Sequence, residues 1–337
     1  MIRSLLKKFI KPRRKDVSLF IYIKFVLILF FYKCLQKLKG IKVQEESCLI
    51  LFPPSLGLGD LIILSKIVDI VKSSKTYKVI KIFNTAPYLQ KVDSSISFIN
   101  LKNIKEIISF QTFILPSPSL LNFLINLILG PKNCKGYIYK NYVNFPEKFP
   151  YKIKDDDQYY LRLKPFKNLF KYENEIKPYV WNNQEREKLS LNKSYFSLKN
   201  YDVSNKYEKF IVLSTYNFYI KFRPKKENIL NEVKKSTKYL DNFCVVILGA
   251  KANREIKYNK ELAKYLRKNL KDVEIIDLSG KLSINNALEI ITQSSFYIGA
   301  NNGLANIAQM VGVNSLLLFN GPEKPIKRKF SEFTKIL

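Results

Sequence analysis

Short apolar runs alternate with longer amphipathic stretches through the second half of the chain. Continuous apolar runs bounded by polar turns are typical of strands in a buried parallel sheet, and apolar residues at helical spacing predict the helices between them. We predict strands at 209–214, 243–249, 273–278, 296–300 and 315–320, and helices at 227–240, 253–269, 284–293 and 303–311. This alternation predicts a Rossmann-like domain over residues 205–337.

The first half of the chain repeats the pattern less regularly. Strands are predicted at 48–52 and 78–83, a Pro/Gly turn at 53–59 and a helix at 60–72, and apolar runs near 107–115 and 119–129 continue the alternation. Residues 150–205 are irregular, aromatic and charged, which indicates a crossover between domains. We therefore expect an α/β protein with two Rossmann-like domains facing a cleft, the first of which covers residues 46–204.

Residues 1–45 differ from both domains. The first 42 residues contain twelve Lys and Arg and one acid, Asp16, and the apolar run 17–31 is interrupted by Lys24. No small-residue cleavage site follows, which disfavours a signal peptide. A spanning helix would be short and charged in its middle, and a helix packed on the first domain is a further alternative. An interfacial helix with basic flanks agrees best and predicts a peripheral membrane protein.

Composition restricts the possible chemistry. The 337 residues suit two domains, and 47% hydrophobic residues exclude wholesale disorder. The net charge of +30 favours anionic partners. The absence of histidine excludes Ser-His-Asp and Cys-His catalysis and His-ligated zinc. The four cysteines form no C-x-x-C pair, so a reducing cytoplasm is expected, and Cys48 and Cys244 are predicted to be buried.

Polar residues follow the strands of the second domain, where ligands bind to open α/β sheets. Asn301, Asn302 and Gly303 stand between a strand and a helix, with Asn306 one turn later; this segment fits either a phosphate site at a helix N-terminus or a plain Asn-Gly turn with an N-cap. Two more loops follow strands, one with Ser214, Thr215, Lys221 and Arg223, the other with Ser279 and Lys281. The hydroxyls and cations of the first loop suit a diphosphate. The second loop lies at the same edge of the sheet, where it can line the same ligand or serve only as a turn with Ser283 as N-cap.

In the first domain, Asp60 begins a predicted helix directly after Gly57 and Gly59. The segment is neither a Walker A loop nor a complete G-x-G-x-x-G fingerprint. A carboxylate at a helix N-terminus is held ionised, which suits a general base, although a plain capping aspartate gives the same pattern.

Five segments, taken together and in order, resemble motifs of glycosyltransferase family 9, the lipopolysaccharide heptosyltransferases and their relatives. They are Gly59-Asp60, the Lys-Phe-Arg-Pro run 221–224, the Ser-Gly-Lys-Leu-Ser-Ile run 279–284, the run 301–308 and the run 319–325. The resemblance spans about residues 46–325 and is strongest in the C-terminal third. It implies a fold of the GT-B type, with two Rossmann-like domains.

The resemblance also implies roles for individual residues. Asp60 would deprotonate the acceptor hydroxyl, and Lys221 would neutralise the leaving phosphate. Ser214 and Thr215 would also hold phosphate, and Asn301, Asn302 and Gly303 would bind the donor diphosphate and sugar. The reaction would be an inverting displacement without a metal or cofactor.

The partners implied are a nucleotide-sugar donor, a lipid-linked acceptor such as lipopolysaccharide core or O-antigen, and an anionic membrane surface. These place the protein in the cytoplasm at the inner face of the cytoplasmic membrane. The family's Asp, His and Trp are replaced by Asn301, Asn306 and Arg223. Another nucleotide sugar than ADP-heptose is therefore compatible with the pocket.

Two other interpretations remain open from the sequence. A non-catalytic protein that binds nucleotides or nucleic acid would use the charge of +30, although no basic-aromatic RNA-binding motif or zinc module is visible and we expect no nucleic-acid partner. A metal-dependent transferase would use Asp155 and Asp157, but that acidic run follows lysines and not a buried strand.

Overall fold

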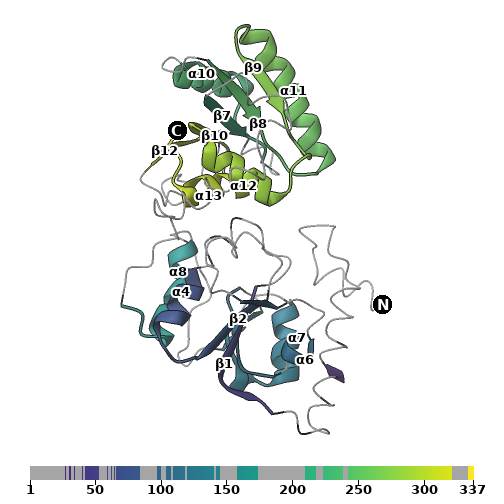
Figure 1. Ribbon diagram of the computed structural model, residues 1–337, viewed down its shortest axis with the longest axis vertical. Helices are drawn as coiled ribbons and strands as arrows, with labels where there is room; N and C mark the ends of the chain where they lie inside the picture. The colour runs from purple at the N-terminus through teal and green to yellow at the C-terminus, as the bar shows by residue number, and fades with distance from the viewer. Residues whose placement is uncertain are drawn as a thin grey trace. The chain divides into compact units, whose positions relative to one another are not determined.

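The computed structural model describes most of the two predicted domains (Figure 1). The described residues are 42–52, 66–83, 97–99, 104–107, 109–117, 120–139, 142–144, 158–173, 209–217, 223–237, 242–320 and 333–337, with single positions such as Cys34, Gly40, Gly59, Ile62 and Leu64. Two compact units are formed, one by Met1–Gly57 with Ile63–Lys177 and the other by Leu58–Ile62 with Pro178–Leu337. The predicted domain boundary at 204/205 lies outside the described residues and stays a prediction.

The first unit contains a six-stranded sheet whose order is β3-β2-β1-β4-β5-β6. The strands are β1 (Gln44–Leu51), β2 (Val79–Phe83), β3 (Ser97–Ile99), β4 (Phe110–Leu115), β5 (Cys134–Tyr139) and β6 (Tyr142–Asn144). All neighbours are parallel except β5 and β6. The helices are α4 (Lys66–Ser73), α6 (Ile104–Ile107), α7 (Leu120–Leu129) and α8 (Gln158–Leu169), with the 3-10 turn η2 at Pro131–Asn133.

Helix α8 corrects the prediction that residues 150–205 are irregular throughout. The helix contains Pro165, and its sequence carries little amphipathic signal. It is held by packing, because Leu163 and Phe166 are fully buried. The ring of Phe166 meets Tyr137 of β5 edge-on at 5.9 Å between centroids. The pattern of apolar residues along this segment does not predict the tertiary contact.

The second unit repeats the same strand order in a fully parallel sheet, β12-β11-β10-β7-β8-β9. Its strands are β7 (Lys209–Ser214), β8 (Phe243–Ile247), β9 (Glu274–Asp277), β10 (Phe296–Gly299), β11 (Ser315–Leu317) and β12 (Thr334–Ile336). Its helices are α10 (Lys226–Thr237), α11 (Asn253–Asn269), α12 (Ile284–Gln293) and α13 (Gly303–Val311). This is the order of a Rossmann sheet, so the predicted α/β class with two Rossmann-like domains is confirmed.

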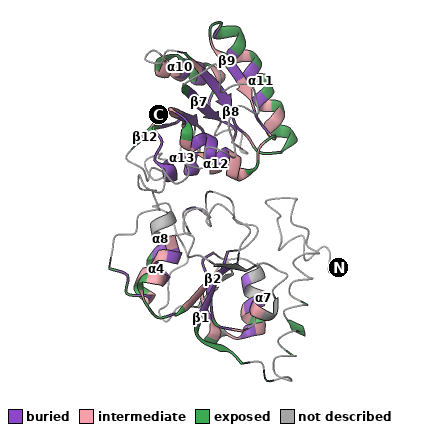
Figure 2. Ribbon diagram, in the orientation of Figure 1, coloured by how far each residue is buried: buried purple, intermediate pink, exposed green. Residues whose placement is uncertain are grey.

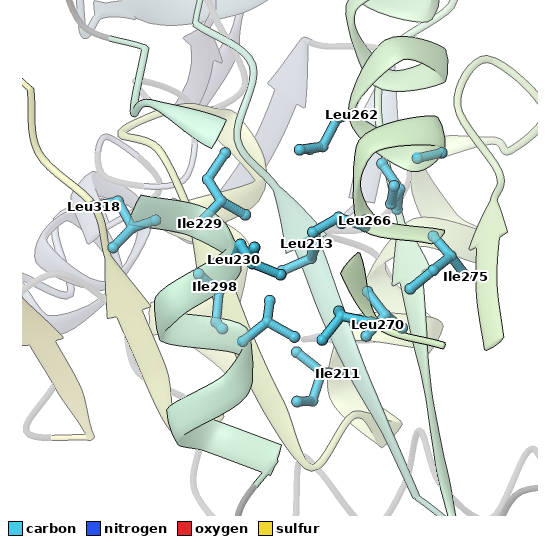
Figure 3. Packing of buried hydrophobic residues seen from close by; sticks show 14 of the residues in the cluster. Ile211, Leu213, Ile229, Leu230, Leu262, Leu266, Leu270, Ile275, Ile298 and Leu318 are labelled. Atoms are coloured by element: carbon cyan, nitrogen blue, oxygen red, sulfur yellow. The ribbon is translucent and has the colours of Figure 1, made fainter. Parts of the chain in front are cut away.

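The core of the second unit lies between β7, β8 and the helices α10 and α11. In Figure 3, Ile211 and Leu213 of β7 lie in one cluster with Ile229 of α10 and Leu266 of α11. All four side chains are fully buried. In Figure 2, β7 and β8 are buried while the outer side of α11 is exposed, which is the pattern of strands buried between helical layers.

The state and burial of the cysteines agree with the predictions from the sequence. All four are free thiols, and Cys48 in β1 and Cys244 in β8 are fully buried, as predicted. Within the described parts of the chain, no helix is long and apolar enough to cross a membrane. Residues 1–26, most of 27–41 and the acidic run at Asp155 and Asp157 lie outside those parts, so the predicted interfacial helix and the metal-site alternative stay untested.

Candidate functional site

The second sheet changes direction between its two central strands. From β7 the chain continues to β8 and β9 on one side, and from β10 it continues to β11 and β12 on the other. Ligands of open α/β sheets bind at such a switch point, outside the carboxyl ends of the strands. Ser214 and Gly299 end these two strands as register partners. The fold therefore brings the predicted site residues at 214–215 next to those at 301–303.

Helix α13 begins at this switch point. Asn302 is its N-cap, and its Oδ1 accepts a hydrogen bond of 3.0 Å from the N–H of Ala305. Among the described residues, the N–H groups of Gly303 and Leu304 have no acceptor. Two free N–H groups and the positive end of the helix dipole favour an anion. The capped Asn-Gly turn of one sequence interpretation is therefore present, and its free N–H groups are compatible with the phosphate site of the other.

The side-chain amide of Asn302 spans the switch point. Its Nδ2 lies 2.9 Å from Ser214 O, 3.0 Å from Ser214 Oγ and 3.1 Å from Tyr216 O. An amide nitrogen has two hydrogens, and both are occupied by these acceptors. Asn302 therefore ties the start of α13 to the end of β7.

Tyr297 contacts both Ser214 and Asn302 at the switch point. It is fully buried, its hydroxyl is hydrogen-bonded to the Ser214 side chain, and burial raises the pKa of that hydroxyl. The hydroxyl also lies 3.5 Å from Asn302 Oδ1. Gly299 makes this possible, because a Cβ there would lie only 2.5 Å from Tyr297 Oη. The ring therefore passes beside the glycine and carries its hydroxyl to the carboxyl end of the sheet.

Arg223 is held beside the end of β7 by two tyrosines. Its guanidinium carbon lies 4.3 Å from the ring centroid of Tyr216 and 5.4 Å from that of Tyr258. Its Nε donates a hydrogen bond of 2.6 Å to Asn217 O. The Tyr258 hydroxyl is 3.4 Å from Thr215 Oγ1, and burial raises its pKa. The loop after β7 thus carries a fixed cation.

The predicted residues after β9 lie farther away. β9 is the second strand from β7, so about 10 Å separates them at the usual strand spacing. Ser279 Oγ accepts a hydrogen bond of 2.8 Å from the buried Asn259, and Lys281 Nζ donates one of 3.0 Å to Asp277 O. Both side chains therefore stabilise their own loop at this edge of the sheet.

A half-buried carboxyl lies near these residues. Glu255, at the start of α11, has its pKa raised by burial, against the opposing effects of the Ala250 N–H and the charge of Arg223. A Cβ at Gly249 would lie 2.9 Å from Glu255 Oε1 and 2.4 Å from Asn259 Nδ2. Gly249 therefore leaves space for both polar side chains at the end of β8.

Gly59 belongs to the second unit by its contacts, together with the rest of Leu58–Ile62. A Cβ at Gly59 would lie 2.2 Å from Asn306 Nδ2 and 3.8 Å from the Cα of Gly303. Gly59 therefore lies close against the first turns of α13, where Asn306 is buried. Gly57, Asp60 and Lys221 lie outside the described residues, so their predicted roles stay predictions.

Sequence reasoning missed five polar residues of this site: Tyr216, Glu255, Tyr258, Asn259 and Tyr297. Tyr258 and Asn259 are hidden in a basic helix, and Glu255 looks like one of its ordinary surface charges. One signal was present for Tyr297. A tyrosine two residues before a glycine on the same strand has both residues on one face, which leaves space for the ring.

Comparison with known proteins supports the fold strongly and the sequence relationship weakly. No protein-family profile and no curated protein sequence matches the chain. An Escherichia coli ADP-heptose lipopolysaccharide heptosyltransferase II superposes with a TM-score of 0.64 at 12% identity, over 86% of this chain and 90% of that one. A family 9 glycosyltransferase from Veillonella parvula gives 0.62 at 11%, over 88% and 87%.

An Escherichia coli heptosyltransferase solved with ADP gives a TM-score of 0.56 at 10% identity, over 86% of this chain and 92% of that one. The chain shares its fold with these glycosyltransferases. The two-Rossmann fold of the GT-B type that the motif resemblance implies is therefore confirmed. At these identities the likeness extends to architecture, and the activity is argued below.

Proposed function

We propose that this protein is a glycosyltransferase that moves a sugar from a nucleotide-sugar to a cell-envelope glycan. The observation that carries the proposal is the switch point of the second sheet, where the N-terminus of α13 is bonded to Ser214 and Arg223 is held on the adjoining β7 loop by Tyr216 and Asn217. Free backbone N–H groups and a nearby guanidinium are what a donor diphosphate requires. The shared fold with heptosyltransferases supports the same assignment.

The mechanism we propose is a single inverting displacement. Asp60 accepts the proton of the acceptor hydroxyl while its oxygen forms the bond to the anomeric carbon, and the bond from that carbon to the diphosphate breaks. Lys221 and the start of α13 stabilise the negative charge that develops on the departing diphosphate. Because these groups supply the positive charge, we propose no metal ion for the step.

We further propose a lipid-linked acceptor at the inner face of the cytoplasmic membrane. The basic residues before residue 42 and the net charge of +30 support attraction to anionic lipid. The donor sugar is left open by the neutral pair Asn301 and Asn306. A heptose and other hexose-like sugars are all candidates.

The test is a thermal-shift screen with ADP-, GDP-, UDP-, dTDP- and CMP-sugars, followed by transfer assays with the stabilising donor and a lipid-linked acceptor. We expect one nucleotide class to raise the unfolding temperature. Asp60→Asn should still bind the donor but lose transfer by a factor of about 100 or more, as expected for a general base.

Three results would contradict the proposal. They are no binding and no turnover with any donor, full transfer by Asp60→Ala, or RNA binding that falls steeply with salt in a protein that binds no nucleotide-sugar. The last result would instead favour the nucleic-acid alternative.

A further inference from the structure

We infer that Asn302 is a positioning residue, which fixes the backbone N–H groups of Gly303 and Leu304 for an anion and does not bind the ligand with its own side chain. The inference rests on the proposed function only for the identity of that anion. It differs from the role implied by the motif resemblance, in which Asn302 contacts the donor.

The first argument is that the hydrogen-bonding groups of the Asn302 side chain are already occupied within the protein. Oδ1 accepts from Ala305 N at 3.0 Å, and Nδ2 lies within 3.1 Å of three oxygens on Ser214 and Tyr216. A ligand that took these hydrogens would leave Tyr216 O without a donor among the described residues, and Ser214 O with only its bond from the Ala300 N–H. The loss of the only donor is unfavourable when a carbonyl is shielded from water, and Tyr216 is 9% exposed.

The second argument is the distance in sequence that the amide joins. Asn302 and Ser214 are 88 positions apart, and each stands at the end of one of the two strands that flank the switch point. Oδ1 accepts the cap hydrogen bond and Nδ2 donates the bonds to β7 and its loop, so these bonds lie at opposite ends of one planar amide. The orientation of the first turn of α13 relative to β7 is therefore set by a rigid group.

The third argument is the support beneath the amide. The buried Tyr297 hydroxyl is hydrogen-bonded to the Ser214 side chain and lies 3.5 Å from Asn302 Oδ1. Asn217 Nδ2 adds a second cross-strand bond of 2.9 Å, to Asn301 O. The turn before Gly303 is thus connected to the β7 loop by two asparagines in opposite directions.

A serine or threonine at position 302 can cap the helix but cannot donate to two carbonyl oxygens. The two substitutions that separate these functions are Asn302→Ser, which keeps a cap acceptor, and Asn302→Asp, which puts a carboxylate oxygen against Ser214 O and Tyr216 O. Asn122 of the first unit is a matched control. It is fully buried, and its Nδ2 donates to Ser117 O at 2.6 Å and Tyr137 O at 3.2 Å.

The deciding measurement is backbone hydrogen exchange of the full-length protein. We expect peptides that cover 214–217 and 300–305 to exchange at least about tenfold faster in both Asn302 variants, with α11 and β8 unchanged. Asn122→Asp should leave those peptides as in the wild type. Unchanged exchange at 214–217 and 300–305 in both Asn302 variants would overturn the inference, whether or not a nucleotide binds.

The second measurement is affinity for ADP, GDP, UDP, dTDP, CMP and inorganic pyrophosphate, at a temperature where every variant is folded. For the probe that binds the wild type, both Asn302 variants should bind about tenfold more weakly, the equivalent of one hydrogen bond, and Asn122→Asp should bind equally well. Wild-type affinity in Asn302→Asp together with faster exchange would overturn the link to the anion. If no probe binds the wild type, the proposed function fails, and the exchange result still decides whether Asn302 fixes the turn.

Discussion

The guanidinium of Arg223 is stacked on the ring of Tyr216, with 4.3 Å between the guanidinium carbon and the ring centroid. Stacking depends on the planar shape of arginine, and the Nε hydrogen bond to Asn217 O adds a second constraint. The planar guanidinium of Arg223 thus stands where the family 9 motif has the planar side chain of tryptophan.

We predict that Arg223→Lys lowers the free energy of unfolding by about 1–2 kcal/mol, because lysine keeps the charge but loses both the stacking and the Nε bond. Urea denaturation measures this. In a Tyr216→Leu background the same change should cost clearly less, since the stacking partner is already absent. Equal costs in the two backgrounds would show that the stacking contributes nothing.

A second prediction concerns the pH dependence of Glu255. Burial raises the pKa of this carboxyl above its ordinary 4.5 in the folded protein. The folded state therefore binds the Glu255 proton more tightly than the unfolded state does. The stabilisation of the fold by this proton binding is complete below pH 4.5 and is lost as the pH rises through the pKa of the folded state. Glu255→Gln should gain stability relative to wild type between pH 4 and pH 8.

The measurement is the difference between the unfolding midpoints of wild type and Glu255→Gln across that pH range. Glu261→Gln, an exposed position on the same helix, controls for the loss of one negative charge. A difference that is flat with pH, or that falls, would contradict a raised pKa for Glu255.

A third prediction follows from Gly299. A Cβ at this position would lie 2.5 Å from both Cε1 and Oη of Tyr297, whose side chain is fully buried. Gly299→Ala should lower the free energy of unfolding by about 1–3 kcal/mol. In a Tyr297→Leu background, where the clashing atoms are absent, thermal or chemical unfolding should show a much smaller cost. An equal cost there would mean that something other than the ring requires the glycine.

A fourth prediction concerns Gly59 and Asn306. Gly59 has helical backbone, where alanine is normally favoured by about 0.5–1 kcal/mol. Its close approach to Asn306 Nδ2 should reverse that sign, so Gly59→Ala should destabilise the wild type. In an Asn306→Ala background the same substitution should become neutral or stabilising. Chemical denaturation of the four proteins tests this, and the same sign in both backgrounds would refute the contact.

A fifth prediction concerns the thiols. Burial raises the pKa of Cys48, Cys134 and Cys244 to about 12, whereas Cys34 is exposed. At neutral pH the native protein should present one fast-reacting thiol to a disulfide reagent, and denaturation should release the other three. Cys34→Ser should remove the fast phase. Two or more fast thiols would contradict the burial of the strand cysteines.

The sequence was most informative where apolar runs are long and continuous. Helices α11, α12 and α13 have the bounds that their periodicity predicts, because each has apolar residues at helical spacing that are buried in the structure. Helix α8 and strands β5 and β6 were not predicted. Pro165 argues against a helix locally, and the helix is held by the burial of Leu163 and Phe166 against distant residues.

The site shows the same limit. The sequence places Ser214 and Asn302 correctly at strand ends, since strand and helix boundaries are local properties. It does not reveal that the amide of Asn302 is occupied by β7, because that contact joins residues 88 positions apart. Tyr258 and Asn259 were invisible for a related reason, since only the folded helix α11 turns them toward the ends of β7 and β9.

The group formed by Ser214, Tyr297 and Asn302 has a further consequence for how the protein responds to its surroundings. Serine and asparagine do not ionise, and burial raises the pKa of the Tyr297 hydroxyl further from neutrality. With no histidine in the chain, the hydrogen bonds at the switch point keep one protonation state from mildly acidic to mildly alkaline conditions. The start of α13 therefore presents the same neutral hydrogen-bonding pattern whether the surrounding solution acidifies or not.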